Sequence, residues 1–180
     1  MRCRYHLSIL ICLMSLSVQA RPLAEHDHGH GQVSVQGAII DTPCAIAVES
    51  RDQSIVMATL PVTRLLRDGQ GPKQVFSIHL INCTLTPALF DQHDWSKFRV
   101  TFDGPVSDGS LFALKGEGKG IGLQISDSNG NVALPGQAMP AGLLQPPDMI
   151  IRFYLRLVEN HQPLRVGSYG ATIRFKLDYY

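Results

Sequence analysis

The sequence predicts an all-β domain with the architecture of an immunoglobulin-like sandwich. Apolar and polar residues alternate in short runs, and the turn-forming residues Gly, Pro, Asn and Asp separate these runs. No long helical spacing of apolar residues is present, although Val62–Arg67 fits a single helical turn. About seven short strands in one domain are typical of two packed antiparallel sheets. The predicted strands are Val33–Ile40, Ser54–Leu60, Val75–Asn82, Lys97–Phe102, Ile121–Ser126, Ile150–Val158 and Tyr169–Tyr179.

The N-terminus has the three parts of a secretory signal peptide. Arg2 and Arg4 precede an apolar run over Leu7–Val18, and Val18-Gln19-Ala20 has the small residues of a cleavage site. The apolar run is too short to cross a bilayer, and no later segment is long enough either. We therefore expect residues 1–20 to be removed on export and the rest of the chain to form one domain without membrane insertion.

The charge of the chain gives no basis for binding nucleic acid or an anionic membrane. The formal net charge is +1 at pH 7, and loss of Arg2 and Arg4 with the signal peptide lowers it by two. A nearly neutral exported chain lacks the basic surface that attracts polyanions.

The cysteines predict one disulfide bond. Cys3 and Cys12 lie in the signal peptide, so the exported chain keeps only Cys44 and Cys83. Two cysteines in an oxidising compartment most simply pair, and closing a loop of about 40 residues stabilises a fold by roughly 3–4 kcal/mol in the chain-entropy description. Two buried free thiols are the alternative. A metal or redox site is disfavoured, because neither cysteine has a second Cys or a His at ligand spacing.

The last predicted strand has an apolar face and a polar face. Thr172, Arg174, Lys176 and Asp178 point to one side, and the alternate residues point to the other. We expect its free edge to have no following segment of the chain to pair with, and an uncovered apolar edge invites strand addition from another chain. The residues of the apolar face are Ala171, Ile173, Phe175, Leu177 and Tyr179.

Motifs for catalysis are missing from the sequence. The glycines of Gly116–Gly122 lack the G-x-G-x-x-G spacing and the following helix of a phosphate-binding loop, so they better fit a turn before a strand. Neither G-x-S-x-G nor H-E-x-x-H occurs. We expect no enzymatic activity and no cofactor.

A histidine cluster near the N-terminus of the exported chain is a weak candidate metal site. His26, His28 and His30 lie within five residues together with Asp27, and imidazoles suit zinc, copper or nickel. The segment is short, and incidental binding is commoner than a dedicated site. A free periplasmic metal-binding module that uses these histidines is the alternative function from a different class.

Segments at both ends and in the middle of the chain resemble bacterial chaperone–usher pilins. Gly31–Cys44 is similar to the N-terminal extension, first strand and first cysteine of these subunits. Gly167 and the penultimate Tyr179 resemble the C-terminal motif of the same family. The central segments Ile81–Cys83, Val100–Gly104 and Gly120–Ile125 resemble P-pilus and type 1 pilus subunits.

The resemblance implies an incomplete immunoglobulin-like sandwich that lacks its last strand and is completed by donor-strand complementation. A periplasmic pilus chaperone first supplies the missing strand and anchors the carboxylate of Tyr180. The N-terminal extension of the next subunit then replaces the chaperone strand. The residues implied for the acceptor groove and for chaperone binding are Gly167, Ala171, Ile173, Phe175, Leu177, Tyr179 and Tyr180.

The resemblance also implies that this chain donates a strand of its own. The donor residues would be Val33, Val35, Gly37 and Ile39, with Gly37 at the shallow part of the acceptor groove. An ordinary first strand of the sandwich is the alternative reading of this segment. The implied divisions are a signal peptide over residues 1–20, a donor-strand extension over 21–36 and a pilin domain over 37–180.

The implied partners are the chaperone, an outer-membrane usher and neighbouring pilin subunits, and the implied route leads through the periplasm to a surface pilus that serves cell adhesion. Val100–Gly104 and Gly118–Asn131 resemble those of the P-pilus terminator, a minor subunit at the base of the fibre. The sequence therefore favours a minor subunit or base terminator, and a major rod pilin is the alternative position.

Overall fold

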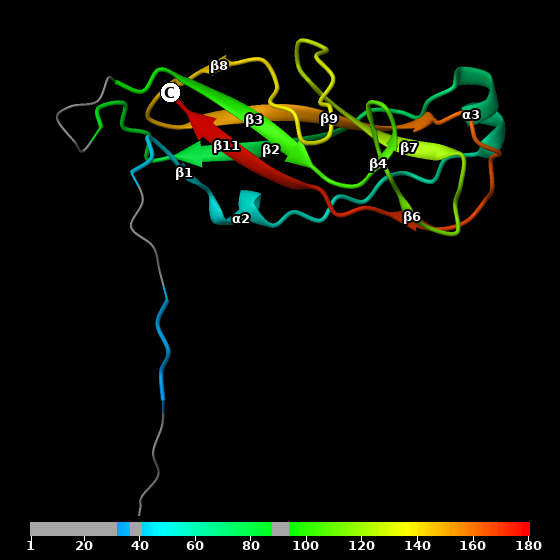
Figure 1. Ribbon diagram of the computed structural model, residues 1–180, viewed down its shortest axis with the longest axis horizontal. Helices are drawn as coiled ribbons and strands as arrows, with labels where there is room; N and C mark the ends of the chain where they lie inside the picture. Colours follow the sequence, from blue (N-terminus) through cyan, green and yellow to red (C-terminus); the bar gives the residue numbers. More distant parts are fainter. Residues whose placement is uncertain (1–31, 37–40, 88–93) are drawn as a thin grey trace, which may run out of the picture. The chain divides into compact units, whose positions relative to one another are not determined.

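The computed structural model describes residues 32–36, 41–87 and 94–180 (Figure 1). The chain divides into two units, Met1–Ala38 and Ile39–Tyr180. In the first unit, residues 32–36 form neither helix nor strand, and Val33 and Val35 are exposed. The strand that we predicted over Val33–Ile40 is therefore absent from its described N-terminal part, because these residues have no neighbouring strand to form a ladder. Residues 37–40 lie outside the described part.

In the second unit, the larger sheet has six strands, and every neighbouring pair in it is antiparallel. Its centre is β9, the longest strand, which pairs with β2 on one side and with β7 on the other. In spatial order the strands are β1 (Ala45–Ile46), β2 (Gln74–Ile81), β9 (Met149–Glu159), β7 (Ile121–Asp127), β5 (Leu111–Phe112) and β4 (Val106–Asp108).

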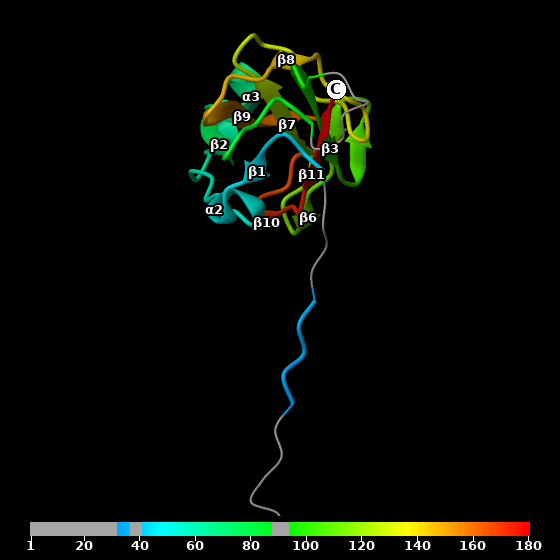
Figure 2. The ribbon, with the colours of Figure 1, turned by 90° about the vertical axis from the view of Figure 1, so that its left-hand side faces the viewer.

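The C-terminal strand belongs to a second, smaller sheet. There β11 (Arg174–Tyr179) pairs with β3 (Lys97–Asp103), whose other edge pairs with β8 (Gly142–Leu143). A separate two-stranded sheet joins β10 (Tyr169–Gly170) to β6 (Lys115–Gly116). In Figure 2, β2 and β9 lie on the left and β3 and β11 on the right.

The two sheets pack face to face around aromatic side chains. The rings of Phe102 on β3 and Phe153 on β9 meet at 4.9 Å between centroids and are nearly perpendicular. Phe76 on β2 stacks against Phe153 at 5.4 Å. Such pairs add stability beyond their buried area, by about 0.5–1.5 kcal/mol each. The architecture confirms the predicted all-β immunoglobulin-like sandwich.

Two short helices flank the extended segment that follows β1. They are α2 (Val48–Arg51) and α3 (Val62–Asp68), and the second confirms the predicted helical turn. Gly69 ends α3 in a left-handed conformation, with φ of +65°, and its backbone N–H donates to the carbonyl of Leu65 at 2.7 Å. None of the helices in the described ranges is long and apolar enough to span a membrane.

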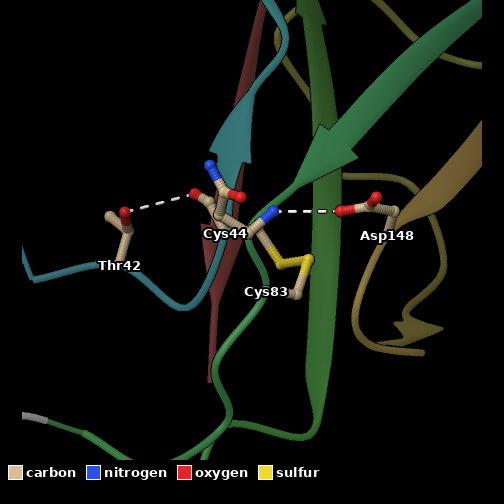
Figure 3. Close-up of a disulfide and its surroundings, with 5 residues drawn as sticks. Thr42, Cys44, Cys83 and Asp148 are labelled. Carbon is tan, nitrogen blue, oxygen red and sulfur yellow. Dashed lines mark hydrogen bonds between the residues drawn. A yellow bond between two sulfur atoms is a disulfide. The ribbon is translucent and has the colours of Figure 1, made fainter.

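The disulfide bond joins Cys44 and Cys83 and ties the start of β1 to the end of β2 (Figure 3). The Cα atoms of the two cysteines are 4.1 Å apart, and both side chains are buried. Next to the bridge, the carboxylate of Asp148 accepts a hydrogen bond from the backbone N–H of Asn82 at 3.0 Å. The hydroxyl of Thr42 donates to the carbonyl of Cys44 at 3.3 Å. The bridge thus fixes the N-terminal edge of the larger sheet.

Two predicted strands differ from the observed elements. Ser54–Leu60 is extended but is not a strand, because among the described residues no backbone group of this segment has a backbone hydrogen-bond partner. The predicted strand Tyr169–Tyr179 is interrupted at residues 171–173. Its two halves pair with β6 and β3, which belong to different sheets, so a single continuous ladder cannot form.

Candidate functional site

An apolar groove with a volume of about 1370 Å³ lies in the second unit. One wall is the extended segment between α2 and α3, and the other is the chain from Leu164 to Phe175. In Figure 1 the cyan segment after α2 follows the same side of the domain as the orange and red C-terminal segment. The floor consists of core side chains from both sheets: Phe76, Phe102, Leu123, Ile125, Leu155 and Leu157.

The first wall presents unpaired backbone to the groove. Along Ser54–Leu60, the side chains of Ile55, Met57 and Leu60 are half-buried and pack against the core. Val56 between them is 88% exposed. Ile55 and Met57 alternate with the exposed Val56 and Ala58, as in a strand with one buried face, but the exposed Thr59 before Leu60 breaks this alternation. No described segment pairs with these residues. The wall is therefore extended, strand-like in its burial pattern over residues 55–58, and without a backbone partner among the described residues.

The second wall has the face that the sequence predicts for the C-terminal strand. Ile173, Phe175, Leu177 and Tyr179 are half-buried and pack against the core, whereas the alternating polar residues are exposed. On one side β11 pairs with β3 from Arg174 opposite Asp103 to Tyr179 opposite Phe98. Its other edge has no strand partner within the described ranges. Both walls of the groove thus carry strand edges without partners.

Gly167 allows the second wall to pass close to the turn at Glu117 and Gly118, which follows β6. Its φ is +154°, and a Cβ atom at this position would lie 2.8 Å from the backbone nitrogen of Gly118. A side chain would therefore displace the backbone at the end of the groove. Next to it, Tyr169 lines the groove, and burial raises the pKa of its hydroxyl.

The residues predicted for the acceptor groove fall into two groups. Gly167, Ala171, Ile173 and Phe175 line the groove. Leu177 and Tyr179 lie further along β11 and pack against the core. The backbone carbonyl of Tyr180 accepts hydrogen bonds from the N–H groups of Ser96 and Lys97, at 3.2 and 2.9 Å. The predicted roles of these residues in strand acceptance stay predictions.

Tyr179 has an unusual hydroxyl. The oxygen is buried, and no described residue forms a hydrogen bond with it. Burial raises the pKa of this side chain, because it disfavours the phenolate. A buried hydroxyl without a partner destabilises the fold.

Part of the predicted donor segment and the whole histidine cluster lie outside the described residues. Val33 and Val35 are described and exposed, whereas Gly37 and Ile39 lie outside the described residues. His26, His28 and His30 also lie outside them. Within residues 32–36, 41–87 and 94–180, no three His, Cys, Asp or Glu side chains are grouped to hold a metal ion.

The first wall is the part of the site that the sequence did not reveal. Its residues predicted a strand, but no pattern in the sequence indicates that this segment borders a groove or faces the C-terminal segment. The position of this segment opposite the C-terminal segment depends on how the two sheets stack. That stacking is set by contacts between residues far apart in the sequence, such as Phe102 and Phe153.

Comparison with known proteins identifies relatives that cover nearly the whole chain. The model of the family described as "Fimbrial protein" matches residues 33–180. The PRS and PAP fimbrial minor pilin proteins of Escherichia coli are each 36% identical to this chain over 156 residues, which cover 86% of this chain and 80% of the relative. The Pap fimbrial major pilin protein of Escherichia coli is 26% identical over 159 residues, covering 84% of each chain.

The fold itself also has a solved counterpart. The crystal structure of the P pilus rod subunit PapA superposes with a TM-score of 0.69 at 21% sequence identity. The match covers 77% of this chain and 100% of that chain. At this level of identity the similarity concerns the fold alone.

Proposed function

The chain belongs to the fimbrial protein family of chaperone–usher pilins, and we propose that it is a minor structural subunit whose groove is filled by a strand from another polypeptide. Like its relatives, it is a structural protein and not an enzyme. Fimbrial pilins associate with other pilin subunits and form surface pili. The proposal concerns the position of this subunit and the way in which it assembles.

The single observation that carries the proposal is the pair of unpaired edges across an apolar groove. Ser54–Leu60 on one wall is extended, and β11 begins on the other wall at Arg174; each lacks a backbone partner on the groove side among the described residues. A strand inserted between them would form hydrogen bonds on both sides and would bury its own apolar side chains on the floor. Burial of four or five such side chains contributes roughly 1.5–3 kcal/mol each.

Two partners in turn would supply this strand. A periplasmic chaperone binds the groove after export and anchors the carboxylate of Tyr180. At an outer-membrane usher, the N-terminal extension of the next subunit then replaces the chaperone strand. In this scheme residues 1–20 are the signal peptide, 21–36 the donor extension and 37–180 the pilin domain. The boundary between the two units, after Ala38, lies close to this division.

A position as a minor subunit is supported by the comparison within one pilus system. Identity is 36% with the PAP minor pilin and 26% with the Pap major pilin. A base terminator is the second candidate, because Val100–Gly104 and Gly118–Asn131 resemble the P-pilus terminator. A terminator must refuse a donor strand, whereas an internal subunit must accept one.

Coexpression in the periplasm tests the proposal. The chain is produced with a tagged pilus chaperone, and the complex is purified through the tag. We expect one chain to be recovered with one chaperone, and we expect the N-terminal extension of a neighbouring subunit to displace the chaperone over hours. A chain that stays stable and alone would contradict the proposal, and a chaperone complex that refuses every extension would favour the terminator.

A further inference from the structure

The turn that follows β7 is held together by one carboxylate. The side chain of Asp127 accepts hydrogen bonds from the backbone N–H groups of Asn129 and Asn131, at 2.9 and 2.8 Å. It also accepts one from the side-chain amide of Asn131 at 2.7 Å. Beyond the turn the chain runs back along β7, where Val132 forms an antiparallel bridge with Ser126. The turn therefore sets the register of a short hairpin at the end of β7.

Asn129 lies exposed in this turn and is followed by a glycine. The hydrogen bond of Asn129 in the turn uses its backbone N–H, and its side-chain amide has no hydrogen-bond partner among the described residues. Gly130 is exposed too, with φ of +86°, and a Cβ atom placed on it would meet nothing within 4 Å beyond its chain neighbours. Its N–H donates to the carbonyl of Asp127 at 3.2 Å. A free amide and an unhindered backbone nitrogen are thus neighbours in an open turn.

The other three asparagines of the chain are better protected. Asn160 is buried, and its amide is hydrogen-bonded. The amide of Asn131 is bound within the turn, and the β-branched Val132 that follows it hinders access to the next backbone nitrogen. Asn82 precedes a buried cysteine of the disulfide bond. Asn129 is therefore set apart both by its neighbour and by its surroundings.

We infer that Asn129 is a site of spontaneous deamidation, in which the backbone nitrogen of Gly130 attacks the side-chain amide and water completes the reaction. The inference does not rest on the proposed function, because it involves neither the groove nor a second polypeptide. It assigns a covalent modification to a turn on the far side of β7 from any predicted site residue.

The reaction needs no reagent other than water. After loss of its proton to the solvent, the Gly130 nitrogen forms a bond to Cγ of Asn129. The bond between Cγ and Nδ2 breaks, and Nδ2 takes up a proton and leaves as ammonia, so that a succinimide ring remains. Water then cleaves one of the two carbonyl bonds of the ring nitrogen. Cleavage of the new bond leaves an aspartate, and cleavage of the original peptide bond leaves an isoaspartate, whose main chain passes through Cγ.

Both products should loosen the hairpin. The new carboxylate lies two positions from Asp127, and like charges at short range repel each other. The isoaspartate also lengthens the main chain between the two N–H groups that the Asp127 carboxylate binds, so the register of the return segment cannot be kept. That segment includes the buried Ala133, whose N–H donates to the carbonyl of Ile125 at 2.9 Å.

Mass spectrometry of the exported chain tests the inference. The chain is recovered from the periplasm, incubated at neutral and at mildly alkaline pH, and digested. Fragmentation of the peptides locates the converted residue and separates aspartate from isoaspartate. We expect conversion at Asn129 and none at the other three asparagines. The rate should rise in proportion to the hydroxide concentration, because the attacking nitrogen must first lose its proton.

Variants of the chain identify the attacking nitrogen. Gly130→Ala should slow the conversion severalfold, because the added methyl group hinders the approach of the nitrogen. Gly136→Ala is the matched control, since Gly136 is also exposed, has φ of +74° and would place a Cβ atom in open space. It should leave the rate unchanged. Asn129→Ser should abolish the conversion at this position.

The structural consequence is measured on the products themselves. Converted chains carry one more negative charge and can be separated by anion exchange. The isoaspartate fraction should unfold at a lower urea concentration than the Asn129→Asp variant, which carries the charge without the longer main chain. Equal urea midpoints would overturn the effect on the hairpin.

Three results would overturn the deamidation site itself. One is the absence of conversion in the folded chain, including the case in which conversion appears only after unfolding in urea. The second is equal conversion at Asn129 and Asn131. The third is the same rate in the Gly130→Ala and Gly136→Ala variants, since the backbone nitrogen of Gly130 would then not be the attacking group.

Discussion

The hydroxyl of Ser50 accepts a hydrogen bond from the backbone N–H of His79 at 3.0 Å and thereby joins α2 to β2. Ser50 is only 2% exposed, and its bond continues the ladder that β1 begins at the end of β2. The backbone N–H of Ala47 donates to the carbonyl of the same histidine at 2.9 Å. The first wall of the groove starts four residues later, so this bond fixes where the wall leaves the sheet.

Ser50→Ala should loosen the first wall. The substitution leaves the N–H of His79 without its acceptor, and a buried donor without a partner costs about 1–3 kcal/mol. We expect a lower free energy of unfolding, measured with urea, and weaker capture by the chaperone. Ser54→Ala is the control, because Ser54 is exposed and its hydroxyl has no hydrogen-bond partner among the described residues. Comparable losses in both variants would argue against this anchoring role.

Phe175→Asp should abolish chaperone capture. Phe175 lines the groove and packs against the core, so a carboxylate there would be buried without a partner and would cost several kcal/mol. Lys176→Asp, one residue further on the exposed face, should have little effect. Recovery of the chaperone complex from the periplasm measures both. If the two variants behave alike, the groove does not bind the chaperone.

Val35→Asp should leave folding and chaperone capture intact and stop incorporation into pili. The reason is that Val35 belongs to the proposed donor segment and is 89% exposed in the first unit. Gly37→Val should act in the same way, by a steric clash in the shallow part of a neighbour's groove. Immunogold labelling of surface pili measures incorporation, with Ser34→Asp as the control on the other face. Normal incorporation of the Val35→Asp chain would disprove the donor role.

Tyr179→Phe should make the fold less sensitive to alkaline pH. The pKa of Tyr179 is raised in the folded chain, so the unfolded chain releases the phenolic proton at a lower pH. Stability is therefore complete below the ordinary tyrosine pKa of about 10 and falls as the pH rises through the folded value. The free energy of unfolding is measured with urea at about one pH value per unit between pH 8 and pH 11, and its dependence on pH is compared between the two chains.

The phenylalanine also removes the hydroxyl that has no partner, so stability at neutral pH should not fall. Tyr180→Phe is the control, since this side chain is more exposed. If the free energy of unfolding of Tyr179→Phe falls with alkaline pH as steeply as that of the original chain, Tyr179 does not contribute to this pH dependence.

Local patterns in the sequence predicted most of the fold. The alternation of Phe175 and Leu177 with Lys176 is strict because one face of β11 lies on the core and the other on solvent. The same rule found β2, β3, β7 and β9. The disulfide between Cys44 and Cys83 confirms the predicted pairing, which followed from the expectation that Cys3 and Cys12 leave with a signal peptide.

Pairing between distant segments limited the rest. Ser54–Leu60 alternates like a strand only over residues 55–58, and a strand also needs hydrogen-bond partners, which the described chain does not supply. The interruption at residues 171–173 arises because β10 and β11 join different sheets, which no local pattern records. Lys119 and Arg165 are 46 positions apart in the sequence, yet their backbones pair in an isolated antiparallel bridge, which no local pattern predicts.

The unpaired wall also makes groove occupancy visible without any label. Amide protons of Ser54–Leu60 have no backbone acceptor among the described residues, so in the empty subunit they should exchange with deuterated solvent almost as fast as in a short peptide. A strand seated in the groove would give alternate amides an acceptor and slow their exchange by orders of magnitude. Mass spectrometry of this one stretch would thus report, residue by residue, how far an incoming strand has advanced along the groove.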